Sequence, residues 1–137
     1  MNRTRAALAT SLVVLVLGAA AAHAAPESQV RQSGDISYIS GGVSEEARDN
    51  LLAMGRDFNI KLILATKAGA YLSDVGIVVS AAGGRPVLDV KSEGPWFYAK
   101  LPAGTYVVEA ISNGATMRRN VTIGAQGMSQ IDFRWDE

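Results

Sequence analysis

Apolar residues recur at every second position along most of the chain after residue 59. A period of two is the pattern of a β-strand with one buried face, and turn residues separate the runs at short intervals. The sequence therefore predicts a mainly β protein, a sandwich of about seven short strands. The alternating positions are Ile60, Leu62 and Leu64; Val75, Ile77 and Val79; Leu88 and Val90; Trp96 and Tyr98; Tyr106, Val108 and Ala110; Val121 and Ile123; and Ile131, Phe133 and Trp135.

The connections between these runs are short and contain glycine. Asn113-Gly114 suits a two-residue hairpin turn with positive φ at both central positions, and residues 82–85 read as a second hairpin connection. No connection is long enough to hold a crossover helix. We therefore expect the sheets to be mainly antiparallel.

Upstream of the first run the apolar spacing changes from that of a strand to that of a helix. Ser44 offers a hydroxyl cap, and Glu45 follows it at the positive end of the helix dipole. Leu51 and Met54 lie on one apolar stripe, and Gly55 stands where a helix commonly ends. The sequence predicts one short amphipathic helix whose stripe packs on the β domain. The alternative is that Leu51 and Met54 dock a partner.

The start of the chain has the pattern of an export signal. Arg3 and Arg5 precede an apolar run over residues 6–22, which ends in Ala22-His23-Ala24. We expect cleavage between Ala24 and Ala25. The strongly apolar centre, residues 12–17, is far shorter than the ~20 residues that cross a bilayer, so a membrane anchor is not expected. The predicted location is the periplasm, with the extracellular space as the alternative.

These patterns divide the chain into four parts. Residues 1–24 are the predicted signal peptide, and residues 25–35 are polar and read as a flexible leader. Residues 36–58 are expected to form an extended arm and the amphipathic helix, and residues 59–137 the sandwich. The mature protein is expected not to be embedded in a membrane, because no second long apolar stretch follows.

Charge and residue usage narrow the chemistry. Removal of residues 1–24 takes two arginines and leaves 13 − 2 = 11 basic residues against 13 acidic ones, so a nucleic-acid partner is not expected. The chain has no cysteine, and its one histidine, His23, lies in the predicted signal peptide. Histidine-assisted nucleophiles and zinc sites with nitrogen or sulfur ligands are therefore excluded from the mature chain. We expect no catalytic residue, no metal and no cofactor.

Two residue groups are candidate sites. Glu45 and Asp49 share a helix face, but a solvated first turn of the helix is the simpler interpretation. Tyr71 and Phe97 are expected to be the exposed aromatic residues, because alternation sends Trp96 to the interior. Exposed rings of this kind can stack on sugars, so a glycan is a second candidate ligand.

The stretch from Gly94 to Val108 carries a more specific signature. It reads Gly-x-Trp, then Leu101-Pro102-x-Gly104-x-Tyr106-x-Val, and resembles the carboxypeptidase regulatory-like domain, a prealbumin-like Greek-key sandwich. The chain as a whole resembles small exported proteins of Gram-negative bacteria. The resemblance implies a module without catalysis of its own that stabilises or binds other proteins. The same fold resembles that of hydroxyisourate hydrolases, whose histidines are missing here, so that activity is rejected.

Three hypotheses follow for the function. The first is a non-enzymatic envelope module that binds or assembles with another envelope protein through sheet edges, loops or the helix. The second is a soluble protein that binds a carbohydrate or another small ligand. The third is an enzyme that relies on carboxylates alone.

Overall fold

Nine strands in two sheets make up most of residues 28–136, the part of the chain that this computed structural model describes. Sheet A has the order β1-β2-β6-β3-β9, and sheet B has the order β5-β4-β7-β8. All pairings are antiparallel except that of β3 with β9. The bounds are β1 Arg31–Ser33, β2 Ile36–Gly41, β3 Ile60–Thr66, β4 Val75–Ala81, β5 Pro86–Ser92, β6 Trp96–Lys100, β7 Gly104–Ser112, β8 Ala115–Ile123 and β9 Ser129–Trp135.

The predicted mainly β architecture with one helix is confirmed, and the seven predicted runs correspond to β3 through β9. The count differs because β1 and β2 add two strands to sheet A. β1 falls in the expected flexible leader, where it pairs with β2 through a tight turn at Gly34. The predicted signal peptide and its cleavage site at Ala24 and Ala25 lie outside the described residues. Within residues 28–136, no helix is long and apolar enough to span a membrane.

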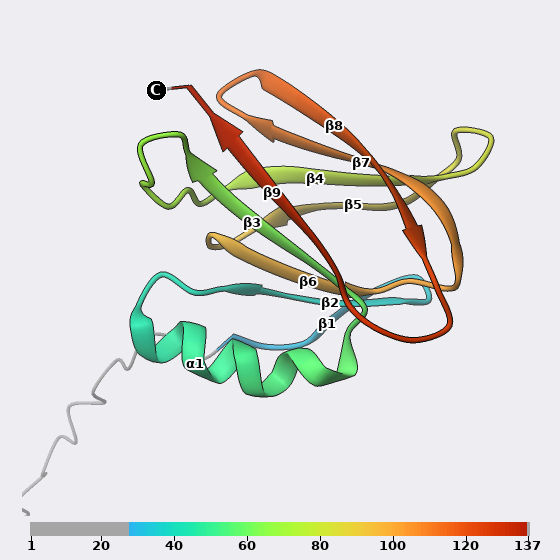
Figure 1. Cartoon of the computed structure of the whole chain (residues 1–137), viewed down its shortest axis with the longest axis horizontal. Coiled ribbons are helices and arrows are strands. Elements are labelled where there is room, and N and C mark those ends of the chain that lie inside the picture. Colours follow the sequence, from blue (N-terminus) through green and yellow to red (C-terminus); the bar gives the residue numbers. More distant parts are fainter. Residues whose placement is uncertain (1–27, 137) are drawn as a thin grey trace, which may run out of the picture.

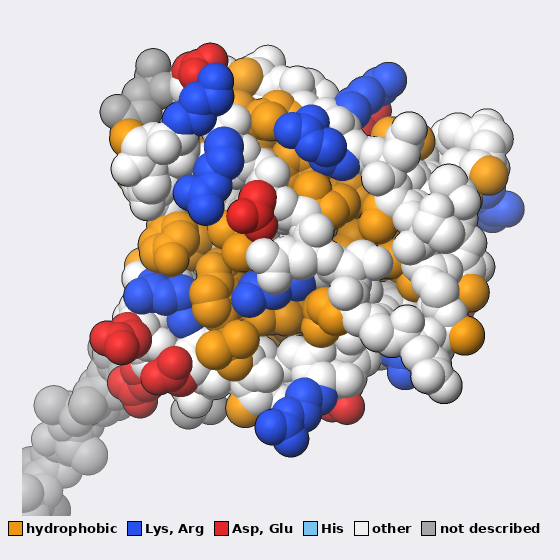
Figure 2. All heavy atoms as spheres, viewed as in Figure 1, with side chains coloured by type: hydrophobic (Ala, Val, Ile, Leu, Met, Phe, Trp, Pro, Cys, Tyr) orange, Lys and Arg blue, Asp and Glu red, His pale blue; other side chains and the backbone are white. Residues whose placement is uncertain are grey.

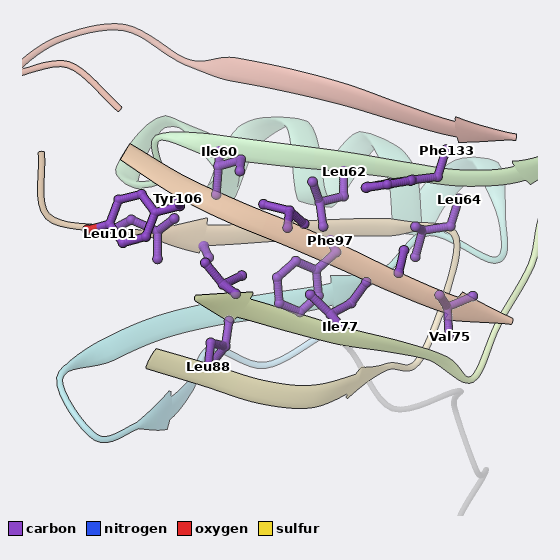
Figure 3. Close-up of a cluster of buried hydrophobic side chains, with 14 of the residues drawn as sticks. Ile60, Leu62, Leu64, Val75, Ile77, Leu88, Phe97, Leu101, Tyr106 and Phe133 are labelled. Atoms are coloured by element: carbon purple, nitrogen blue, oxygen red, sulfur yellow. The ribbon is translucent and has the colours of Figure 1, made fainter. Parts of the chain in front are cut away.

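The main core lies between the two sheets. Figure 3 shows Ile60, Leu62, Leu64, Phe97 and Phe133 of sheet A pointing toward side chains of sheet B such as Ile77 and Leu88. Leu101 is buried at one end, where Asn59 makes two hydrogen bonds to its backbone, at 2.7 and 2.8 Å. Because burial of each large apolar side chain contributes about 1.5–3 kcal/mol, this layer carries most of the stability.

The helix α1 (Glu45–Met54) lies on the outer side of sheet A, next to β2 (Figure 1). Ser44 caps it as predicted, since its hydroxyl oxygen accepts a hydrogen bond from the Ala47 amide at 3.1 Å. A short 3₁₀ turn, η1 (Gly55–Asp57), follows. Gly55 has an ordinary helical φ of −64°, so it is not the left-handed cap that the sequence suggested. A Cβ there would lie 2.7 Å from the Tyr98 ring, which explains the glycine by close approach.

The two hairpin turns form as predicted. Asn113 and Gly114 have φ values of 48° and 78° between β7 and β8, as a turn of this type requires. Residues 82–85 connect β4 to β5, with φ values of 93° at Gly83 and 86° at Gly84.

The facing of β6 differs from the prediction. Phe97 and Ala99 point into the sandwich core, whereas Trp96 and Tyr98 point outward, toward α1. Tyr98 joins Ile39, Leu51 and Phe58 in a second, smaller core between the helix and the sheet. Both faces of β6 are covered, one by sheet B and the other by α1, so apolar residues occupy consecutive positions of the strand. Alternation alone therefore does not predict which of these residues face the sandwich core.

Candidate interaction surface

The register of β6, β3 and β9 arranges nine side chains in three rows on the outer face of sheet A. In each row a central β3 residue has one neighbour on either side. These β3 residues face away from the sandwich, because Leu62 and Leu64, which alternate with them, lie in the main core. The rows are Tyr98–Lys61–Gln130, Trp96–Ile63–Asp132 and Tyr71–Ala65–Arg134, where Tyr71 joins through an isolated bridge to Ala65.

The helix covers one part of this outer face and leaves the other part open. Leu51 and the half-buried Met54 pack with Tyr98 and Phe58 beneath α1. Beyond the helix the surface has no further layer in the described part of the chain. We call Arg48, Lys61, Ile63, Tyr71 and Trp96 the open face. Figure 2 shows apolar side chains between α1 and β9, with lysine and arginine side chains over and beside them.

Two cations of the open face lie on aromatic rings. The Lys61 Nζ atom is 3.7 Å from the centroid of the Trp96 ring and 5.5 Å from that of Tyr98. The Arg48 guanidinium carbon lies 5.0 Å from the centroid of the Tyr71 ring, and Arg48 also donates a hydrogen bond to the Gly42 carbonyl at 2.9 Å. Each such contact contributes about 0.5–1 kcal/mol at an exposed site and more where water is excluded. The cations therefore hold the rings in place.

Burial changes the acid–base behaviour of this region. It lowers the pKa of Lys61 below its ordinary value, and the neighbouring Asp132 carboxylate opposes part of that shift. Burial also raises the pKa of Tyr98. The hydroxyl of Tyr98 and the indole Nε1 of Trp96 are both buried, and neither has a hydrogen-bond partner among the described residues. Polar atoms left in this condition cost about 1–3 kcal/mol each.

The four residues singled out from the sequence have different surroundings. Tyr71 is 49% exposed, as expected, and lies in the open face. Phe97 was expected to be exposed, and this is wrong, because its side chain is fully buried in the sandwich core. Leu51 is fully buried against sheet A and Met54 is half-buried, so the stripe packs on the β domain. The structure brings Leu51 and Met54 together and separates both from Phe97.

The period-two pattern does not predict that the residues of the open face lie together. Alternation predicts Trp96 in the interior, and no sequence pattern places Lys61 beside it. The missing information was the pairing of β3 with both β6 and β9, which joins residues more than thirty positions apart. The signal available in the sequence was the run Trp96-Phe97-Tyr98, since three consecutive aromatic residues in one strand place rings on both faces.

Apolar and aromatic groups lie beside lysine, arginine and carboxylate groups, which together suit a partner with both apolar and polar atoms. Within residues 28–136, no group of three or more acidic, histidine or cysteine side chains is arranged to hold a metal ion. Glu45, Glu46 and Asp49 are exposed at the start of α1, as expected of a solvated first turn.

Comparisons of the chain with protein-family models, with curated proteins and with solved structures found no match.

Proposed function

We propose that the mature chain is a non-enzymatic module of the periplasm that binds another protein of the cell envelope through the open face. One observation carries this proposal: the side chain of Tyr71 is 49% exposed and forms one apolar surface with the half-buried side chains of Ile63 and Trp96, beside the helix. Tryptophan, tyrosine and arginine are the residues most often responsible for binding energy at protein interfaces. The open face holds one of each.

The preordered state of these side chains supports binding. Lys61 and Arg48 already lie on the rings of Trp96 and Tyr71, so the rings lose little conformational freedom when a partner arrives. The surrounding charges, including Asp132, provide polar contacts at the rim. An apolar centre with a polar rim is the usual anatomy of such an interface.

The family resemblance forms the second part of the proposal. We propose that β3 through β9 constitute a prealbumin-like Greek-key sandwich of the carboxypeptidase regulatory-like type. Several contacts of the signature stretch support this. Leu101 is buried at one end of the core, Tyr106 and Val108 re-enter the core, and the Tyr106 hydroxyl donates a hydrogen bond to the Pro102 carbonyl at 2.6 Å.

A carbohydrate or small ligand is the second candidate. Tyr71, Trp96 and Tyr98 follow one another along one side of β3, and a row of rings on a sheet face suits stacking on pyranose rings. Against it, Tyr98 is buried and Lys61 lies over the Trp96 ring, which leaves Tyr71 as the ring most open to a sugar. Protein binding therefore fits the geometry better.

The test compares two substitutions at equally exposed apolar positions. Tyr71→Glu changes the open face. Val30→Glu changes a side chain that is also 49% exposed but lies outside the open face, just before the edge strand β1 of sheet A. Proteins retained from the host's envelope extract by the wild type should also be retained by Val30→Glu and lost with Tyr71→Glu. Equal retention by both variants contradicts the proposal. Retention of glycan alone, lost with Tyr71→Glu, favours the second candidate.

A further inference from the structure

The strands β8 and β9 are edge strands of different sheets and lie side by side along one open seam of the sandwich (Figure 1). In the described part of the chain β8 pairs with β7 alone, and β9 pairs with β3 alone. One end of the seam is closed, because Trp135 Nε1 donates a hydrogen bond to the Ala115 carbonyl at 3.0 Å. A groove of about 600 Å³ lies at this closed end of the seam. We call it the seam groove; its lining includes Lys67, Met117, Arg119, Asp132, Arg134 and Trp135.

The floor of the seam is apolar and incompletely covered. Met117 and Val121 of β8 and Ile131 of β9 pack against the main core but remain partly exposed. They are exposed because the two edges face each other without pairing. Figure 2 shows a strip of apolar side chains between β9 and β8. Apolar surface flanked by polar groups commonly marks an interaction site.

The rim of the seam groove carries an excess of positive charge. Lys67 is paired with Asp136 at 2.7 Å, and Arg134 lies 3.9 Å from Asp132. No ion pair is found for Arg119 among residues 28–136. Its guanidinium lies 5.6 Å from the centroid of the Phe133 ring and donates a hydrogen bond to the carbonyl of its own neighbour in β8.

The adjacent residue Arg118 behaves differently. It is on the opposite face of β8, where it forms an ion pair with Glu109 of β7. Glu109 lies with Arg118 on that opposite face, so it does not neutralise Arg119, which has no ion pair among residues 28–136. Arginines on an edge strand oppose pairing with an identical strand through charge repulsion. The same charge attracts an acidic chain.

We infer that the seam groove binds an extended acidic segment of a partner protein, which adds to the free edge of β8 as a further strand. Strand addition supplies backbone hydrogen bonds along the edge, and alternate side chains of the segment enter the groove or face away from it. Apolar side chains contact Met117 and Val121, and acidic side chains reach Arg119. The seam groove contains none of the five residues of the open face, which it borders at Asp132 and Arg134, so the two sites are tested with different substitutions.

The probe is a fluorescent peptide as long as β8 in which glutamate and valine alternate. A second peptide has lysine in place of glutamate. A third peptide keeps the glutamates but carries N-methyl groups on every second amide, so that one edge of the peptide cannot form backbone hydrogen bonds with β8. Binding to the protein purified after export is followed by fluorescence anisotropy. The glutamate peptide should bind about tenfold more tightly than the lysine peptide, and less tightly as salt rises. N-methylation should weaken binding about fivefold or more, because it removes the edge hydrogen bonds.

Matched charge reversals locate the site. Arg119→Glu should lower the affinity for the glutamate peptide about tenfold, and Arg119→Gln should lower it by an intermediate factor. Arg85→Glu makes the same charge change in the β4–β5 turn and should leave affinity within about twofold. Circular dichroism of each variant confirms that it is folded. Equal affinity for the acidic and basic peptides, or unchanged binding by the folded Arg119→Glu variant, overturns the inference.

Discussion

Replacement of Leu51 by alanine tests whether α1 is an integral part of the fold. The Leu51 side chain is fully buried between the helix and sheet A, with Ile39, Phe58 and Tyr98 around it. Truncation removes about three carbons, worth about 0.8 kcal/mol each, and the cavity left behind adds to the cost. We expect the free energy of unfolding to fall by about 3 kcal/mol, a large fraction of the 5–15 kcal/mol typical of a domain.

The assay is urea denaturation followed by far-ultraviolet circular dichroism and by tryptophan fluorescence. Leu52→Ala is the matched control, because Leu52 is the next residue of the same helix and is 53% exposed. It should change the unfolding free energy by no more than about 0.5 kcal/mol. If Leu51→Ala costs less than about 1 kcal/mol, or if only the helix amides exchange faster while global unfolding is unchanged, α1 is a separate, weakly docked element and the reasoning fails.

Three further outcomes follow from particular contacts. Tyr98→Phe removes a buried hydroxyl that has no partner among the described residues, so the unfolding free energy should rise by about 1 kcal/mol, whereas Tyr106→Phe breaks a hydrogen bond and should lower it by a similar amount. Gly94→Ala places a Cβ 2.3 Å from a carbonyl oxygen of β2 and should cost about 3 kcal/mol in thermal or urea unfolding, while Gly124→Ala, with its nearest atom at 3.7 Å, should be close to neutral. The lowered pKa of Lys61 means that the unfolded state binds more protons between the folded pKa and 10.5. The wild type should therefore gain stability relative to Lys61→Met as pH rises through that window, and a relative loss over the same range contradicts the shift.

The local features of the fold were predictable because neighbouring residues determine them. Ser44 caps the helix, Asn113-Gly114 forms its turn, and the runs from Ile60 to Trp135 become strands β3 through β9. Each of these depends on propensity and period within a few residues. The polar segment 31–33 offered no such signal, and it became β1 only by pairing with β2.

The candidate site could not be predicted because tertiary pairing creates it. Phe97 and Trp96 have similar apolar character, and both faces of β6 are covered, so the sequence does not show which of them lies between the sheets. The parallel pairing of β3 with β9 brings Ile63 beside Asp132 across 69 positions of sequence. Periodicity contains no information at that range, so Lys61 and Trp96 were identified only from the structure.

Site-specific photocrosslinking in the host shows whether the open face contacts another protein of the cell envelope, as we propose. A photoreactive phenylalanine analogue at position 71 replaces a side chain that is 49% exposed, and the same analogue at position 30 is the control with equal exposure. We expect one discrete crosslinked protein in the envelope fraction with the analogue at position 71 and none with the analogue at position 30. The same product from both positions, or no product from position 71 in cells that export the folded protein, contradicts it.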